Sequence, residues 1–205
     1  MPKIKWVGLI SEKDVEIYQN RPLPDNAQKM KMPQSIAKMM ICALPFAVPA
    51  FITIFLSMFL KTYLAKTVVI DKWFVLIGLV AAMALLFVHE LLHACVFPKD
   101  ATVFVGIVKP FSPVALCSKE ISKPRFVAMS LLPYVLGVAP LVAFCLVPPH
   151  LTWLNGLLFG LEFLGLVSPY PDVYNVYQVL KQTPPESKVF FYQNDTYFVP
   201  QDVQK

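Results

Sequence analysis

The chain has 205 residues, of which 57% are hydrophobic and only 15% are charged, and its mean hydropathy is +0.58. This balance is outside the usual range of soluble domains and predicts an integral membrane protein. The formal net charge is +5, but the basic residues are spread over every polar segment, so the charge indicates no nucleic-acid partner.

The first 35 residues contain no continuous apolar stretch and many charged side chains. They therefore predict no cleavable signal peptide, and we expect residues 1–35 to form a cytoplasmic N-terminal segment. Isolated aromatic residues in this segment would allow it to lie along the membrane surface. The first apolar run after it is expected to act as the insertion signal.

Four apolar runs follow, each long enough or nearly long enough to cross a hydrocarbon core of about 30 Å. They are Met39 to Leu60, Trp73 to Phe97, Phe126 to Val147 and the shorter Leu151 to Val167. Lys and Arg are concentrated before the first run, between the second and third, and after the fourth, so the positive-inside rule predicts two cytoplasmic termini. We expect a multi-pass domain over residues 36–181, a cytoplasmic tail over residues 182–205, and a location in the cell membrane.

The second run contains the sequence His89-Glu90-Leu91-Leu92-His93. Residues four apart on an α-helix share one face, so His89 and His93 can offer ring nitrogens to one metal ion. Glu90 flanks that face, in the position of a general base that reaches a metal-bound water without being a ligand. Ionisable side chains inside a membrane helix are costly and usually mark a functional site, which favours metal binding over simple packing.

The loop after the second run contains two short β-branched or apolar stretches, Thr102 to Val108 and Val114 to Cys117, separated by residues 109–113. This pattern predicts a hairpin-like pair of strands on the cytoplasmic side. In the fourth run, Gly156 and Gly160 are four residues apart and give a smooth face for close packing against another helix of the same chain.

A catalytic zinc ion normally has three protein ligands, so a third must come from another segment. The candidates are Asp172 and Glu162. Counted along each helix from its outer end, the histidines lie about 24 and about 30 Å deep, Asp172 about 31 Å and Glu162 about 16 Å. Depth therefore favours Asp172, and Glu162 stays as the alternative.

Two prolines in Ser168-Pro169-Tyr170-Pro171-Asp172 should break the fourth span here. Pro171 suits the first turn of a new helix that runs to about Lys181, where free amide groups favour the anionic Asp172. Asn175 falls on the same face three residues later. It can orient the aspartate or bind a substrate carbonyl, and simple solvation is the alternative.

The tail from Lys188 to Val199 has alternating apolar residues around Gln193-Asn194-Asp195, which predicts a small β-hairpin.

Together these motifs resemble the three-helix core of site-2 proteases, which are zinc-dependent intramembrane proteases. More closely, the chain is similar to a bacterial family of small membrane proteins described as putative zincin peptidases. The resemblance covers about residues 73–181 and is strongest in three stretches, His89 to Pro98, Lys119 to Lys123 and Asp172 to Asn175. It implies an all-α integral membrane fold of about four transmembrane helices around such a core, in the bacterial cytoplasmic membrane. It also implies that the hairpin-like loop can hold an extended substrate, and an ordinary interfacial loop is the alternative.

The sequence thus predicts a zinc metallopeptidase that hydrolyses peptide bonds of membrane-associated protein or peptide substrates. In this reading Zn²⁺ is held by His89, His93 and Asp172, and Glu90 is the general base. Two alternatives stay open: a non-catalytic membrane protein with a structural or sensory metal site, and a zinc hydrolase acting on a lipid or small amide. Glu90 favours the peptidase over a purely structural site, which has no need of a base.

Overall fold

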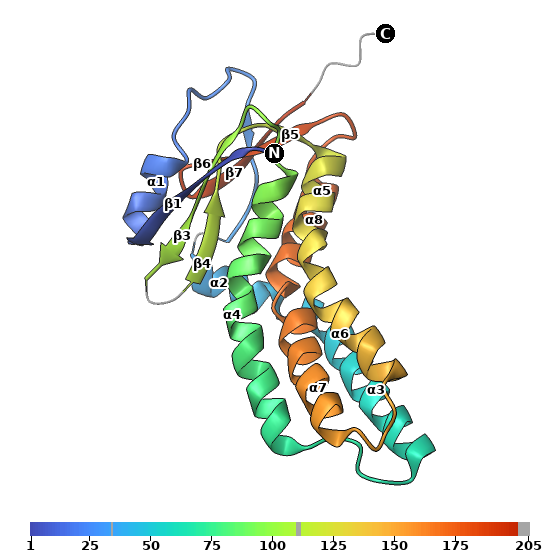
Figure 1. Ribbon diagram of the computed structural model, residues 1–205. Coiled ribbons are helices and arrows are strands. Elements are labelled where there is room, and N and C mark those ends of the chain that lie inside the picture. The colour runs from blue at the N-terminus through green and yellow to red at the C-terminus, as the bar shows by residue number, and fades with distance from the viewer. Residues whose placement is uncertain (34, 110–111, 201–205) are drawn as a thin grey trace. The chain divides into compact units, whose positions relative to one another are not determined.

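The computed structural model describes residues 1–33, 35–109 and 112–200, and Figure 1 traces their path. The remaining positions fall in the expected N-terminal segment, the turn of the loop hairpin and the end of the tail, and lie outside the described residues. Helices make up more than half of the described chain, and two small sheets account for the strands. The prediction of an all-α integral membrane fold is thus confirmed in part, since the chain is mostly helical but also contains these two sheets.

Among the described residues, three helical stretches are long and apolar enough to cross a membrane: Ala37–Ala65, Lys72–Val96 and Lys123–Leu146. They correspond to the first three apolar runs of the sequence. The first consists of α2 (Ile36–Ala43), a 3₁₀ turn and α3 (Val48–Ala65), the second is α4 (Lys72–Val96), and the third consists of α5 (Lys123–Leu131), a 3₁₀ turn and α6 (Val135–Leu146). The fourth run forms α7 (Thr152–Val167), which is shorter at 16 residues.

The chain divides into two compact units, each built from segments that are distant in sequence. The first, called here the sheet unit, consists of Met1–Cys42, Glu90–Leu132 and Asp172–Lys205. The second, called the helical unit, consists of Ala43–His89 and Pro133–Pro171.

Glycines allow close helix packing inside the helical unit. A methyl group built on Gly160 of α7 would overlap the carbonyl oxygen of Val75 in α4, and one on Gly78 would overlap that of Leu157. Gly156 lies equally close to the backbone of Asp71. The prediction that the glycine face of the fourth run packs against another helix of the chain is therefore confirmed.

A half-buried lysine lies at the carboxyl end of α6 in the same unit. Lys61 Nζ donates hydrogen bonds to the carbonyl oxygens of Phe144 and Val147 and to Asn155 Oδ1, the last at 2.7 Å. The amide of Asn155 donates in turn to the carbonyl oxygen of Pro148 at 2.9 Å. The ammonium group thus provides hydrogen-bond donors for carbonyls that have no partner within the helix. Its positive charge also interacts favourably with the negative, carboxyl-terminal end of the helix dipole.

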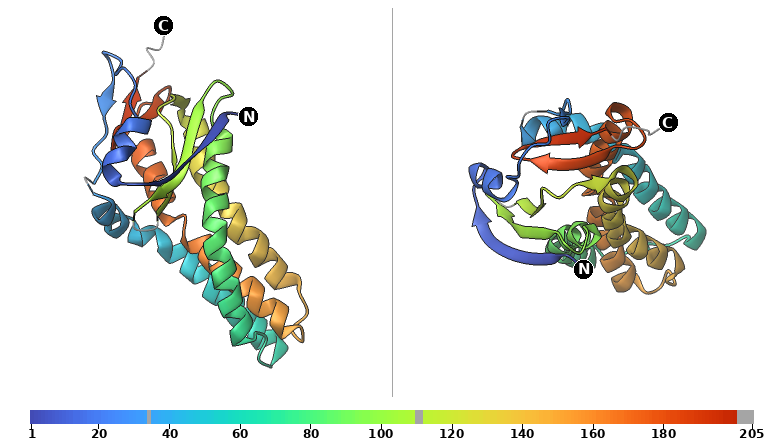
Figure 2. Two further views of the ribbon diagram at one scale, coloured as in Figure 1. Left: turned by 60° about the vertical axis from the view of Figure 1, so that its left-hand side comes forward. Right: turned by 90° about the horizontal axis from the view of Figure 1, so that it is seen from above.

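The sheet unit contains a three-stranded sheet in the order β1-β3-β4. Strands β3 (Thr102–Val108) and β4 (Ser112–Leu116) form the antiparallel hairpin that the sequence predicted. Strand β1 (Lys3–Ile10) pairs parallel with β3, alongside which it lies in Figure 2. We did not predict β1, because its partner is almost a hundred residues away in the sequence.

The second sheet has four antiparallel strands in the order β2-β7-β6-β5. The predicted tail hairpin is present as β6 (Lys188–Tyr192) and β7 (Asp195–Val199). The flanking strands are β2 (Gln28–Lys29) and β5 (Ile121–Ser122). The sheet therefore joins the N-terminal segment, the loop after α4 and the tail.

Candidate metal centre

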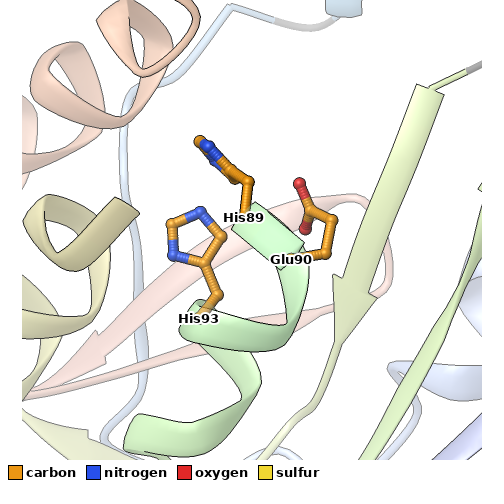
Figure 3. Close-up of side chains that lie close together, drawn as sticks. All are labelled: His89, Glu90 and His93. Atoms are coloured by element: carbon orange, nitrogen blue, oxygen red, sulfur yellow. The ribbon is translucent and has the colours of Figure 1, made fainter. Parts of the chain in front are cut away.

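The histidines and the glutamate of the His-Glu-x-x-His motif lie together on α4. Ligand atoms of His89, Glu90 and His93 all fall within 4.8 Å of one another. Figure 3 shows the two imidazoles on one side of the helix and the Glu90 carboxylate beside them on another. Both histidines are buried, with 7% and 9% of their surface exposed. This cluster follows directly from the helical periodicity of the motif.

The ring of His93 is held through its Nδ1 atom. This nitrogen lies 2.8 Å from the carbonyl oxygen of Met129, at the end of α5. A carbonyl only accepts hydrogen bonds, so Nδ1 must donate, and the lone pair of the neutral ring is then on Nε2. Histidines that bind metals are usually oriented by such a bond from the other ring nitrogen.

Asp172 lies next to Nε2, the other nitrogen of that ring. Its Oδ1 atom is 3.5 Å from His93 Nε2, and both residues belong to the sheet unit. The two atoms come from α4 and from α8 (Tyr170–Gln182), which are separated by almost eighty residues. The structure thus places next to the motif the acid that depth along the helices had favoured.

The spacing of these atoms fits a shared zinc ion. Two ligand atoms at about 2.0–2.1 Å from tetrahedral zinc are separated by about 3.3 Å. The observed 3.5 Å between His93 Nε2 and Asp172 Oδ1 is close to this value. Imidazole nitrogen and carboxylate oxygen are both common zinc ligands, so the chemistry of the donor set also fits.

The local sequence explains why Asp172 is available. Helix α7 ends at Val167, two turn residues follow, and α8 begins at Tyr170 with Pro171 in its first turn. The predicted break is therefore present, and the new helix ends at Gln182, one residue beyond the expected Lys181. Asp172 lies in the first turn of α8, where unpaired backbone amides favour a negative charge.

Glu162, the alternative ligand, has a different environment. It is in the helical unit and its side chain is fully buried, at 0% exposure. One carboxylate oxygen accepts a hydrogen bond of 3.3 Å from Ser57 Oγ of α3, and the other has no hydrogen-bond partner among the described residues. The cluster of three metal-binding side chains found within the described chain includes neither Glu162 nor Asp172, and of these two acids it is Asp172 that contacts a motif histidine.

Asn175 lies one helical turn after Asp172 on α8, as its spacing predicted. Its Oδ1 atom is buried and has no hydrogen-bond partner in the described part of the chain. A buried amide oxygen without a partner is costly, at about 1–3 kcal/mol, and such groups in native proteins often mark functional positions. This placement weakens the alternative of a simply solvated asparagine.

A small cavity of about 10 Å³ lies beside His89 within the helical unit. Its polar lining includes His89 and Ser168, and the rest is formed by apolar residues and a glycine: Ala82, Leu85, Leu86, Leu136, Leu161, Leu164 and Gly165. This volume is about that of a single water molecule, and the two polar side chains can hydrogen-bond it.

Sequence reasoning missed the carbonyl of Met129. No sequence signal identifies it, because every residue type offers the same backbone carbonyl oxygen at this point. The apolar character of the third run predicts only that α5 is a helix, not which of its carbonyls meets His93.

Comparison with known proteins identifies a family. The model of a protein family described as "Putative zincin peptidase" matches residues 82–188, just over half of the chain. The matched region includes the His-Glu-x-x-His motif, Met129, Asp172 and Asn175, and it begins after the first membrane-spanning stretch. No curated protein and no solved structure matches the chain.

Proposed function

Since the chain belongs to the family described as putative zincin peptidases, we propose that it is an integral membrane zinc metallopeptidase that cleaves membrane-associated substrates. The cofactor of zincins is zinc, and the His-Glu-His cluster on α4 is a suitable place for it. The observation that carries the proposal is the contact between Asp172 and His93, because it brings a candidate third ligand from another helix to one of the two histidines.

We assign zinc binding to His89, His93 and Asp172. Zinc bound there would act as a Lewis acid and lower the pKa of water in the site towards about 7. The hydrogen bond to the Met129 carbonyl fixes the His93 ring, so that Nε2 is always the nitrogen that faces the site.

Glu90 is the general base of the proposed reaction. It neighbours His89 on α4, and its carboxylate lies beside the two imidazoles in Figure 3. It would accept the proton of the attacking water and then return that proton to the leaving amine of the cleaved peptide bond. A structural metal site would need no such base.

Substrate binding is assigned to Asn175 and to the edge of the three-stranded sheet. The buried Oδ1 of Asn175 marks a side chain whose amide group can orient Asp172 or hydrogen-bond the substrate backbone. Strand β4 is an edge of its sheet within the described residues, and an extended peptide can add to such an edge through backbone hydrogen bonds. Substrate helices must unwind before cleavage, because their carbonyls are otherwise occupied.

We also propose a location in the bacterial cytoplasmic membrane with both termini in the cytoplasm. Strand β2 near the N-terminus pairs with β7 near the C-terminus, which supports a common side for the two ends. In this arrangement α4, the stretch of α5 and α6, and the stretch of α7 and α8 would form a three-helix core similar to that of site-2 proteases.

The decisive experiment compares wild type with Glu90→Gln, a substitution that keeps the size of the side chain and removes its basicity. Both proteins are purified in detergent, and bound zinc and cleavage of fluorogenic transmembrane peptides are measured. We expect equal zinc content and at least about 100-fold slower cleavage in the variant. Cleavage by Glu90→Gln at the wild-type rate would contradict the assignment. Zinc-dependent hydrolysis of lipid amides or esters, without peptide cleavage, would favour the lipid or small-amide hydrolase instead.

A further inference from the structure

Strand β1 has three large apolar side chains on its surface. Ile4, Trp6 and Leu9 are exposed over 38%, 61% and 58% of their area. We call these three residues the β1 apolar face. They lie outside the region matched by the family model, so the zincin core does not account for them.

A bulge in β1 places the three residues on one side of the sheet. Ile4 pairs with Val103 and Trp6 with Val105, and the register then skips Val7, so that Leu9 pairs with Ile107. Regular alternation would have put Leu9 on the opposite side. The bulge is possible because Gly8 adopts a φ of 75°, a conformation that glycine tolerates.

The same side of the sheet contacts the end of a membrane-spanning helix. Val103 and Val105 are part of a buried cluster that also contains Ala94 and Phe97, at the carboxyl end of α4. Strand β3 begins at Thr102, six residues after α4 ends at Val96, so the chain allows a separation of roughly 20 Å at most. Both observations lie within the sheet unit, and they put the β1 apolar face close to the level where α4 leaves the hydrocarbon core.

The opposite side of β1 has a different character. Lys3 and Lys5 pair with Thr102 and Phe104, and the ammonium group of Lys5 lies 5.8 Å from the centre of the Phe104 ring. Further along, this side is covered by the short helix α1 (Val15–Tyr18), whose Val15 and Tyr18 pack in the cluster of Ile10, Val108 and Leu116. The exposed apolar residues of the strand therefore gather on one side, whereas the other side has the lysines and a covered apolar cluster.

We propose that the β1 apolar face is inserted into the interfacial region of the lipid bilayer and anchors the sheet unit to the membrane surface. Tryptophan with neighbouring aliphatic residues is favoured at this depth, and the lysines on the other side can extend towards anionic headgroups. In water, three exposed apolar residues on an edge strand would instead promote aggregation. The anchor does not depend on the zinc site or on peptidase activity.

Fluorescence quenching in lipid nanodiscs tests the proposal. The full chain with Trp73→Phe and Trp153→Phe keeps Trp6 as its single tryptophan, and nanodiscs are prepared with and without lipids brominated near the headgroup end of the acyl chains. We expect blue-shifted emission that brominated lipid quenches strongly and that iodide in the buffer quenches only weakly.

The matched control moves the reporter to Ile17 of α1, which is 69% exposed and belongs to the covering of the other side of the sheet. In the chain with Ile17→Trp, Trp6→Phe, Trp73→Phe and Trp153→Phe, iodide should quench the emission and brominated lipid should not.

A second measurement leaves Trp73 and Trp153 in place. The emission of the Trp6→Phe variant is subtracted from that of the otherwise native chain, and the difference is the signal of Trp6. Quenching of Trp6 by iodide to the same degree as the position-17 reporter would overturn the proposal. So would protection from both quenchers, which would indicate a protein partner or a second copy on this face.

Discussion

Asp172 and His93 come from different helices, and in our proposal each depends on the other to hold the metal. The 3.5 Å contact between Asp172 Oδ1 and His93 Nε2 brings two ligands together, whereas Glu162 is already engaged by Ser57 in the helical unit. We predict that Asp172→Asn lowers zinc affinity by at least about 100-fold, because a neutral amide replaces an anionic ligand. Titration of the purified apoprotein with zinc against a competing chelator measures the change.

Glu162→Gln is the matched control, because it makes the same chemical change in a carboxyl group of the adjacent helix. Its zinc affinity should equal that of wild type. Loss of zinc from Glu162→Gln with retention by Asp172→Asn would reverse the two assignments.

Asn175 offers a separate test of the site. Its unpartnered Oδ1 atom contributes nothing to stability, so removing it should not weaken the fold. We predict that Asn175→Ala keeps its zinc and a thermal midpoint at or above that of wild type, while kcat/KM for a peptide substrate falls at least about tenfold. A lower midpoint with unchanged kcat/KM would show that Asn175 is a structural residue.

The residues of the site differ in how far the sequence could predict them. His89, Glu90 and His93 share one helix, so their spacing alone determines how they lie. The depth of Asp172 could be estimated because prolines mark the start of α8, but its contact with His93 depends on packing between helices that no local pattern records. The Met129 carbonyl could not be predicted at all, since its role belongs to the backbone.

At the level of elements, the contact of α4 with α7 depends on glycines. A β-carbon at position 160 would overlap backbone atoms of Val75, Gly78 and Leu79, which cannot move as a side chain would. Alanine has a higher helix propensity than glycine by about 1 kcal/mol, but the overlap should outweigh this gain. We predict that Gly160→Ala lowers the free energy of unfolding by about 2 kcal/mol, as measured by unfolding in mixed micelles.

Ala84 provides the comparison for this variant. It lies on the exposed side of α4, so Ala84→Val adds volume to a transmembrane helix without meeting another helix. Its stability should match that of wild type. If Gly160→Ala were as stable as Ala84→Val, the result would contradict the close backbone contact between α4 and α7 at position 160.

The strands separate into those that local sequence predicts and those that it does not. The hairpins β3–β4 and β6–β7 join neighbouring segments, and alternation with turn residues was enough to predict both. Strands β1, β2 and β5 pair with partners far along the chain, and two of them are only two residues long. Short or long-range strands leave no periodic signal, so residues 1–35 were expected only as a polar segment.

At the scale of the whole molecule, the sheet unit restricts how the chain can cross the membrane. Its two sheets combine the N-terminal segment, the loop after α4 and the tail, and hydrogen-bonded strands must lie on the same side of a bilayer. The stretches Ala37–Ala65 and Lys72–Val96 account for two crossings before the loop. With Lys123–Leu146 as a third crossing, the tail would return to that side through a fourth, and we propose that α7 provides it.

We therefore predict that Lys13, Lys99 and Glu186 face one side of the membrane, and Lys66 and His150 the other. All five are exposed, and the loops that contain the last two are joined by a hydrogen bond of 3.0 Å from the Asp71 amide to the Thr152 carbonyl. Single cysteines at these positions, in a chain with its four native cysteines replaced, are treated in intact cells with a membrane-impermeant maleimide. The positive-inside rule predicts labelling only at positions 66 and 150.

Labelling at position 186 but not at 13 would mean an odd number of crossings. The pairing of β2 with β7 could not then exist in the membrane, because its two strands would lie on opposite sides of the bilayer.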